Sequence, residues 1–263
     1  MAQGVAEVVP VSSSAQLVLL PWLLGWEQPA DRTTFAAGLH AGSCLGIAWA
    51  LRSELRALHP GEIALLAGAS IPAAAAGLLA ADVVEERLGR PPQLAALLAG
   101  AGALMWWVDA RAATRDGRRV VTVRPSRAVT ATAAPRPVTP VQSALAGLAQ
   151  AAALVPGVSR SGATLTALRA AGVDRAAAER FSLLLSLPVT AGAAGLTLAR
   201  TDRSTLRALG PGLAAGTVTA ALAGAVAATR RTARPGTPLT GAALYRLGLA
   251  AGVVARLVRK GEL

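Results

Sequence analysis

The chain has 263 residues, of which 53% are hydrophobic and 15% are charged, and its formal charge at pH 7 is +12. A soluble domain carries roughly a quarter charged residues, so this composition excludes an ordinary soluble protein. Aromatic residues make up only 3% of the chain and no basic stripe carries interleaved aromatics, which excludes a nucleic-acid-binding surface that stacks bases.

The first predicted element is an interrupted apolar segment over residues 1–25. Glu7, Pro10 and a run of three serines beginning at Ser12 break its apolar pattern. Proline stops a helix, and the freed backbone groups survive at membrane depth only where protein lines a cavity. The segment is therefore predicted to form a re-entrant hairpin of helix, break and helix rather than a simple span.

Three apolar stretches of helix length follow, at residues 35–51, 62–81 and 92–108. Spanning a bilayer takes about 20 mostly apolar residues, so each stretch is a candidate transmembrane helix. Residues 109–140 then form a basic linker with seven arginines and two aspartates. The positive-inside rule predicts that this linker lies in the cytoplasm.

Residues 141–172 form a second interrupted segment, broken by a Pro-Gly pair at Pro156 and by a Ser-Arg-Ser cluster. The same reasoning predicts a second re-entrant hairpin. Three more candidate spans follow at residues 176–199, 208–229 and 239–257. We therefore expect an all-α integral membrane protein with six transmembrane helices and two hairpins.

The two interrupted segments look like copies of one sequence. "VPVSSS" and "VPGVSRS" share a pattern, Gln3 and Gln150 precede them at similar distances, and three candidate spans follow each. With the linker 109–140 in the cytoplasm, the two hairpins enter the membrane from opposite sides. We therefore predict a single membrane domain built from an inverted repeat, 1–108 and 141–263, with a binding site where the repeats meet.

Arg160 is the clearest candidate for a functional residue. A charged residue at bilayer depth costs at least about 2.5 kcal/mol on insertion scales. Its planar guanidinium matches phosphate oxygens, and a helix beginning beside it would point free N–H groups at the same anion. Ser159, Ser161 and Thr164 add hydroxyl donors. The alternative is a structural arginine paired with an acidic neighbour.

Glu7 is the second charged residue that is costly to bury. Near Pro10 and the serines it could act as a general base, ligate a divalent cation or pair with Arg160. The alternative is a glutamate in a frayed and solvated chain end. Ser12 and Ser13 also have a structural alternative, because Pro-Val-Ser-Ser is a good helix cap.

Other polar residues of the apolar stretches carry weaker signals. Arg246 could add a second positive charge to a phosphate pocket, or could equally be a snorkelling or structural arginine. His40 is expected to make a helix-packing hydrogen bond rather than a catalytic contact. The adjacent Glu179 and Arg180 are expected to mark the membrane interface. Cys44 is the only cysteine, which excludes an intrachain disulfide.

These residues resemble the motifs of bacterial undecaprenyl-diphosphate phosphatases of the bacitracin-resistance type. "QGVAEVVPVSSSAQL" is similar to the family's Glu/Gln-x-x-x-Glu-x-x-Pro-x-Ser-Ser-x-x-His stretch, and "PGVSRSGAT" matches its Pro-Gly-x-Ser-Arg-Ser-Gly-Ala-Thr signature. "AAAERFSLLLSLP" and "ALYR" look like later segments of the family, in the right order. The resemblance therefore spans nearly the whole chain.

The resemblance implies an integral membrane enzyme with six spans and two re-entrant hairpins in an inverted repeat. Such an enzyme removes the terminal phosphate of undecaprenyl diphosphate with a divalent cation, Mg²⁺ or Ca²⁺. It thereby regenerates the lipid carrier for peptidoglycan precursors in the bacterial plasma membrane, an activity linked to bacitracin resistance. Its partners are the polyprenyl diphosphate and the bilayer. Whether it forms a homo-oligomer is left open by the resemblance.

The resemblance also implies roles for individual residues. Glu7 matches the second acidic residue of the motif, as base or metal ligand, and Ser13 matches the proposed nucleophile. Ser159, Arg160 and Thr164 match the phosphate-binding signature. The further residues expected to contact the substrate or its phosphates are Gln3, Ser12, Gln16, Ser161, Gly162 and Arg246.

Two positions depart from the family pattern. Gln3 stands where many members have a glutamate, and Gln16 stands where the histidine is expected. Glutamine cannot transfer a proton at neutral pH, and nothing in the sequence shows that His40 replaces the missing histidine. Because the chain begins almost on the motif, we expect either a start upstream of Met1 or a shortened first hairpin. The alternative function is a carrier of the same fold that moves a lipid phosphate without cleaving it.

Overall fold

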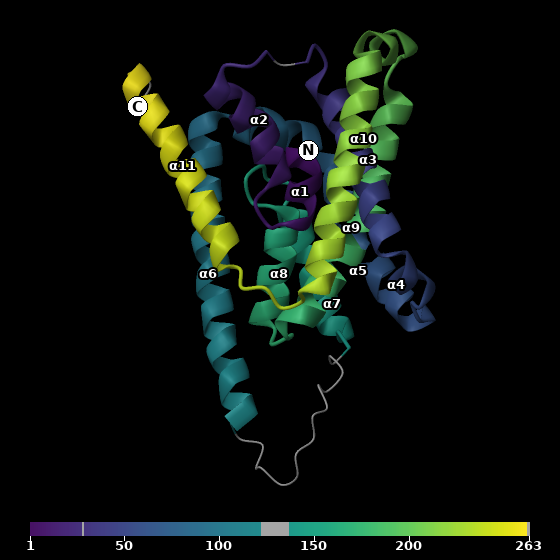
Figure 1. Cartoon of the computed structure of the whole chain (residues 1–263), viewed down its shortest axis with the longest axis vertical. Helices are drawn as coiled ribbons and strands as arrows, with labels where there is room; N and C mark the ends of the chain where they lie inside the picture. The colour runs from purple at the N-terminus through teal and green to yellow at the C-terminus, as the bar shows by residue number, and fades with distance from the viewer. Residues whose placement is uncertain (28, 122–136, 262–263) are drawn as a thin grey trace.

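The computed structural model describes residues 1–27, 29–121 and 137–261, which fold into α-helices without a β-strand (Figure 1). This confirms the all-α prediction. The helices are α1 (Ala2–Val8), α2 (Ser13–Leu24), α3 (Arg32–Ala50), α4 (Arg52–Arg56), α5 (Pro60–Leu88), α6 (Pro91–Val121), α7 (Pro140–Ala152), α8 (Arg160–Ala170), α9 (Arg175–Arg200), α10 (Arg203–Ala233) and α11 (Thr240–Lys260).

Five stretches of the described helices are long and apolar enough to cross a membrane. They are Pro60–Ala80, Pro91–Asp116, Arg175–Arg200, Arg203–Ala233 and Thr240–Lys260. The stretch predicted at 35–51 forms α3, whose polar residues such as Thr33, His40 and Ser43 lower its apolar character. The prediction of a protein with several membrane-spanning helices is therefore confirmed.

Both interrupted segments contain the expected break. Residues 9–12 separate α1 from α2, and residues 153–159 separate α7 from α8. The last residue of each break, Ser12 or Ser159, has a positive φ, 68° and 73°, and directly precedes the next helix. Among the described residues these serines are the non-glycine residues with positive φ, a conformation that costs energy and concentrates at functional sites. The two breaks therefore share an unusual local conformation.

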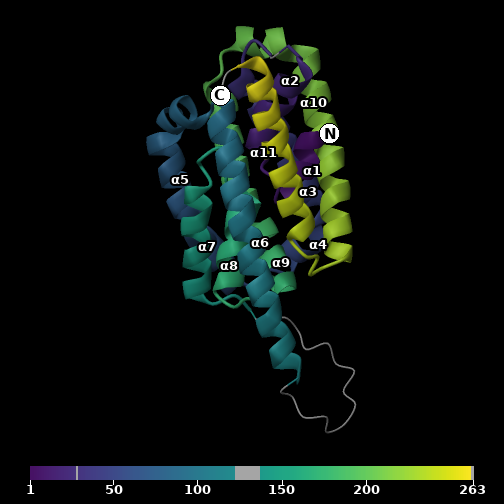
Figure 2. The ribbon, with the colours of Figure 1, turned by 90° about the vertical axis from the view of Figure 1, so that its left-hand side faces the viewer.

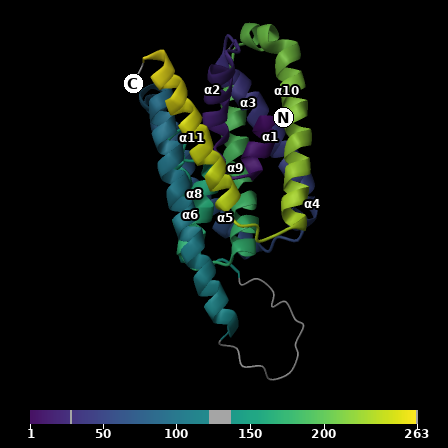
Figure 3. The same cartoon turned by 60° about the vertical axis from the view of Figure 1, so that its left-hand side comes forward.

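The short helices α1 and α2 lie between α6 and α11 on one side and α10 on the other (Figures 1 and 3). One apolar core, with Ile47, Leu168 and Leu185, packs α3, α8 and α9 together. A second core, with Leu19, Leu98 and Val253, joins α2 to α6 and α11, which lie side by side in Figure 2. Large apolar side chains are exposed on the outer faces of the helices, among them Leu45, Leu78, Leu79 and Leu222. That outer surface suits contact with lipid.

The first part of the predicted linker 109–140 is helical, because α6 continues to Val121. Residues 122–136 lie outside the described part of the chain. Asp109 is buried within α6, where it accepts hydrogen bonds from Arg169 (3.1 Å) and from Arg175 (3.0 and 2.7 Å). These ionic partners offset the cost of burying the Asp109 carboxylate.

Glu179 and Arg180 also form ion pairs between helices. Arg231 of α10 donates to Glu179 at 2.6 Å, and Arg180 donates to Glu54 at 3.1 Å and to Glu62 at 2.8 Å. Glu179 is buried, whereas Arg180 is 40% exposed. Glu179 and Arg180 therefore both stabilise the packing of the start of α9 against neighbouring helices, in addition to any role at the membrane interface.

Candidate active site

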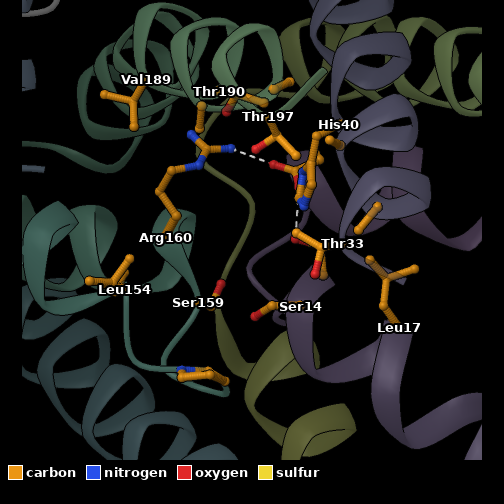
Figure 4. A pocket seen from close by; sticks show the side chains of 18 of the residues that line it. Ser14, Leu17, Thr33, His40, Leu154, Ser159, Arg160, Val189, Thr190 and Thr197 are labelled. Atoms are coloured by element: carbon orange, nitrogen blue, oxygen red, sulfur yellow. Dashed lines mark hydrogen bonds and ion pairs between the residues drawn. The ribbon is translucent and has the colours of Figure 1, made fainter. Parts of the chain in front are cut away.

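A cavity of about 390 Å³ lies between the two interrupted segments, with α3 and α9 completing its wall (Figure 4). This volume is within the range of small-molecule sites. The polar side chains that line it are Glu7, Ser13, Ser14, Arg32, Thr33, His40, Gln150, Ser159, Arg160, Thr190 and Thr197. Apolar residues, including Leu17, Val18 and Val189, line other parts of it, so the cavity can hold both a polar group and an apolar chain.

Arg160 and Glu7 form an ion pair in this cavity. Arg160 is the first residue of α8, and its Nη2 lies 2.7 Å from Oε2 of Glu7, 153 positions earlier in the chain. Glu7 is 4% exposed and belongs to α1, which rules out the frayed chain end. Of the roles considered for Glu7, the pairing with Arg160 is confirmed. In the described part of the chain Glu7 is the one ion-pair partner of Arg160, so other donors of the guanidinium fork can meet an anion.

The second oxygen of the Glu7 carboxylate accepts hydrogen bonds from within its own segment. Ser13 Oγ donates to Glu7 Oε1 at 2.7 Å, and Gln3 Nε2 donates to the same oxygen at 2.8 Å. The break between α1 and α2 turns the chain so that the first residue of α2 faces α1. A hydroxyl hydrogen-bonded to a carboxylate is the arrangement required for base-assisted attack.

His40 comes to the same carboxylate from α3. Its Nδ1 lies 2.7 Å from Glu7 Oε1, and because a carboxylate only accepts, the imidazole Nδ1–H is the donor. The contact joins two helices, as a packing hydrogen bond would, but it lies in the cavity wall, where the His40 side chain is 29% exposed. Sequence reasoning did not predict this contact, because it depends on how α3 packs against α1.

Ser159 both lines the cavity and caps α8. Its Oγ accepts a hydrogen bond from the backbone N–H of Gly162 at 3.2 Å. Helix α8 therefore begins at the cavity wall, where the free N–H groups of its first turn favour an anion. The capping role that was an alternative for the serines of the first segment is thus observed for a serine of the second.

Several predicted site residues lie near the cavity without lining it. Thr164 Oγ1 is 2.6 Å from Ser182 Oγ and also donates to the carbonyl of Arg160 at 3.1 Å, so it stabilises α8 against α9. Gln16 is buried and its Nε2 donates to the carbonyl of Val11 at 3.5 Å. The other predicted residues outside the cavity lining are Gln3, Ser12, Ser161, Gly162 and Arg246.

Arg246 contacts backbone carbonyls and does not line the cavity. Its Nη2 donates to the carbonyls of Gly157 at 2.7 Å and Val158 at 3.1 Å, and its Nε donates to that of Leu98 at 3.3 Å. The side chain is fully buried. Helix α11 therefore places Arg246 behind the break and outside the cavity lining, where it fixes the loop that ends in Ser159, and its Nη1 has no hydrogen-bond partner among the described residues.

The fold and this cavity define an integral membrane protein with a buried polar site suited to an anionic group. The family model described as bacitracin resistance protein BacA matches residues 1–251. An undecaprenyl-diphosphatase of Geobacter sulfurreducens is 36% identical over 241 residues, 84% of this chain and 82% of that protein. That of Gemmatimonas aurantiaca is 35% identical over 209 residues, 73% of this chain and 71% of that protein. The chain belongs to the BacA family.

Proposed function

We propose that this chain is a membrane phosphatase that hydrolyses undecaprenyl diphosphate to undecaprenyl phosphate and inorganic phosphate. The main support for the proposal is that the Glu7 carboxylate binds both the guanidinium of Arg160 and the hydroxyl of Ser13 in one cavity. The relatives that share the family are named undecaprenyl-diphosphatases, which supports the same substrate here. The activity regenerates a lipid carrier for cell-wall synthesis and accounts for bacitracin resistance.

In the bilayer, the two interrupted segments form re-entrant hairpins. Helices α1, α2, α7 and α8 have 7, 12, 13 and 11 residues, too few to cross a bilayer, which takes about 20. With α3 as the sixth span, the chain is an inverted repeat of 1–108 and 141–263, and the linker lies on the cytoplasmic side of the plasma membrane. The matching serines at the two breaks support this arrangement.

The substrate binds with its diphosphate in the polar part of the cavity and its isoprenoid tail along the apolar helices. A phosphate oxygen takes the fork of Arg160, and the first turn of α8 stabilises the same charge. Arg160 can keep its Nη2 on Glu7 and offer its other guanidinium donors to the phosphate. Stabilising the charge of the transferred phosphoryl group is the main demand of this chemistry.

In the reaction, Ser13 Oγ forms a bond to the terminal phosphorus and its proton passes to Glu7 Oε1. The bond from that phosphorus to the bridging oxygen breaks, and undecaprenyl phosphate leaves. Water then hydrolyses the phosphoserine and releases inorganic phosphate. In a second route water attacks the phosphorus directly, with Glu7 accepting the water proton and Ser13 binding the phosphate.

A divalent cation, Mg²⁺ or Ca²⁺, fits this cavity with oxygen ligands from the substrate. No three His, Cys, Asp or Glu side chains gather into a metal site in the described ranges. Glu7 offers one carboxylate in the cavity, and Gln3 orients that carboxylate from outside the lining through its hydrogen bond. Mg²⁺ is commonly held by one or two carboxylates and substrate phosphates, so Glu7 would hold it together with the substrate. When bound, such an ion neutralises phosphate charge.

A carrier that binds the lipid without cleaving it is the alternative. It rests on the absence of the motif histidine at position 16. Gln16, however, points its amide at the backbone of Val11, while His40 supplies an imidazole to the cavity wall. The site therefore has a histidine from another helix, which favours the phosphatase.

Phosphate release by the purified protein, given undecaprenyl diphosphate in detergent, tests the proposal. The wild type should release inorganic phosphate and Arg160→Ala should not. Arg160→Lys keeps the charge but loses the fork, so its rate should fall about tenfold or more. A wild type that binds the lipid yet releases no phosphate, with or without added Mg²⁺ or Ca²⁺, would support the carrier.

A further inference from the structure

The side chain of Gln150 is a buried amide in the cavity wall that the reaction above does not use. Gln150 lies in the last turn of α7, directly before the break that leads to Ser159 and Arg160. It is 3% exposed and lines the cavity. Neither its Oε1 nor its Nε2 has a hydrogen-bond partner among the residues that the structure describes.

A buried amide whose oxygen and nitrogen both lack a hydrogen-bond partner is a candidate contact for a bound ligand. Most buried polar side-chain atoms in proteins have a hydrogen-bond partner, so an amide unpaired at both ends is unusual. Because both Oε1 and Nε2 of Gln150 lack a partner in the described part of the chain, this amide can both accept and donate a hydrogen bond.

Gln142, eight residues earlier on the same helix, shows what a structural role looks like. Gln142, also on α7, donates from Nε2 to the carbonyl of Ala171 at 3.1 Å. Its Oε1 accepts from the backbone N–H of Thr139 at 2.9 Å, completing a capping box at the start of α7. Gln142 therefore serves the fold with both amide groups, whereas Gln150 has both of its own uncommitted within the described chain.

The surroundings of Gln150 indicate the chemistry of the missing partner. Ser159 and Arg160, at the other end of the same break, line the same cavity and suit a phosphate group. A phosphate oxygen accepts a hydrogen bond from Nε2. A P–OH group, or a water molecule held by the phosphate, donates to Oε1. An isoprenoid tail can satisfy neither atom.

We propose that Gln150 is a substrate-binding residue whose amide hydrogen-bonds the diphosphate group in this cavity. The proposal rests on the proposed function and adds a contact from the helix that enters the second break. Gln150 and Arg160 then hold the phosphates from the two ends of one loop.

Substrate affinity in a Glu7→Gln background, which removes the base of both routes and is expected to bind without turnover, tests this contact. Gln150→Met removes the amide and keeps the length of the side chain. It should weaken binding of undecaprenyl diphosphate and of inorganic pyrophosphate about tenfold or more, the size of a hydrogen bond to a charged group. Its melting temperature should stay near that of the parent, because no hydrogen bond within the described protein is lost.

Gln142→Met is the matched control on the same helix. It should lower the melting temperature and leave both affinities unchanged. Gln150→Glu is a second test with a side chain of nearly the same shape, and its negative charge should weaken both ligands further. Should Gln150→Met fall in melting temperature as far as Gln142→Met, with Gln150→Glu binding both ligands normally, the amide is structural and the proposal fails.

The two ligands separate the sources of the phosphate. Weaker binding of both supports a contact with the diphosphate headgroup of the lipid. Unchanged binding of both, weakening of the lipid alone, or weakening of pyrophosphate alone would each overturn the proposal. Failure of the proposed function would look different, because the wild type itself would then release no phosphate, whatever the affinities of the Gln150 variants.

Discussion

Glu7 is the residue on which the site depends, because one buried carboxylate meets side chains from three other places in the chain. Arg160 binds one oxygen, and Ser13, Gln3 and His40 surround the other. A buried carboxylate is stable only when such partners compensate its lost hydration. The same contacts align the Ser13 hydroxyl, so the stability of Glu7 and its chemical role have one origin.

Glu7→Gln should abolish turnover while keeping lipid binding. The amide has nearly the same shape but cannot accept the Ser13 proton, and general base assistance is typically worth about 10²–10⁴-fold in rate. Phosphate release and lipid affinity should be measured in one detergent preparation. Turnover within a few-fold of the wild type would show that Glu7 is not the base.

His40 should act as a positioning residue for Glu7. His40→Asn retains an N–H donor near the place of Nδ1, whereas His40→Ala removes it. We expect kcat to fall in His40→Ala and to be partly restored in His40→Asn, with a similar KM in both. Equal losses in the two variants would contradict a role that depends on this hydrogen bond to Glu7.

At the scale of elements, the close packing of α3 against α10 fixes where His40 lies. A Cβ atom on Gly42 or Gly46 would meet the backbone of Thr217 or Ala221. Small residues at four-residue spacing let membrane helices approach closely. The position of α3, and with it the imidazole in the cavity, therefore depends on glycines far from the catalytic motifs.

Gly46→Ala should push α3 away from α10 and lower thermal stability. Overpacking a tight contact typically costs about 1–3 kcal/mol. Gly68→Ala, on α5, is the control, since nothing lies within 4 Å of the added Cβ. Melting in detergent should separate the two variants. Equal melting temperatures would mean that α3 and α10 can separate freely.

At the scale of the whole molecule, Asp109 joins the first half of the chain to the second. This buried side chain of α6 accepts hydrogen bonds from Arg169 of α8, from Arg175 of α9 and from the backbone N–H of Leu239 before α11 (3.2 Å). Arg169 is itself 1% exposed. The arrangement ties the end of α8 and the starts of α9 and α11 to one point on α6.

Asp109→Ala should destabilise the protein strongly, because two arginines lose their shared partner. Breaking a buried ion pair from one side typically costs about 3–5 kcal/mol. Asp116→Ala is the matched control, because Asp116 is 41% exposed and pairs only with Arg169 among the described residues, so its loss should cost about 1 kcal/mol or less. Thermal or denaturant unfolding in detergent measures the difference, and equal unfolding of both variants would contradict it.

Local sequence patterns were enough to predict the helical architecture, the membrane setting and the two breaks. Apolar stretches and the Pro10 and Pro156 interruptions act locally, so they are visible in the order of residues. The motifs around Glu7 and Arg160 also indicated the family and the phosphate chemistry. Proline and apolar length do not depend on a distant partner, which is why these predictions could be made without a structure.

Which of these residues contact one another depends on tertiary packing and could not be predicted from local patterns. It paired Glu7 with Arg160 across 153 positions and brought His40 from α3 to the same carboxylate. It also placed Arg246 against the backbone of the loop, and Gln150 is buried without a hydrogen-bond partner among the described residues. These outcomes depend on how helices far apart in the chain pack and rotate against one another. The spacing of residues along the chain does not show how distant helices pack against one another.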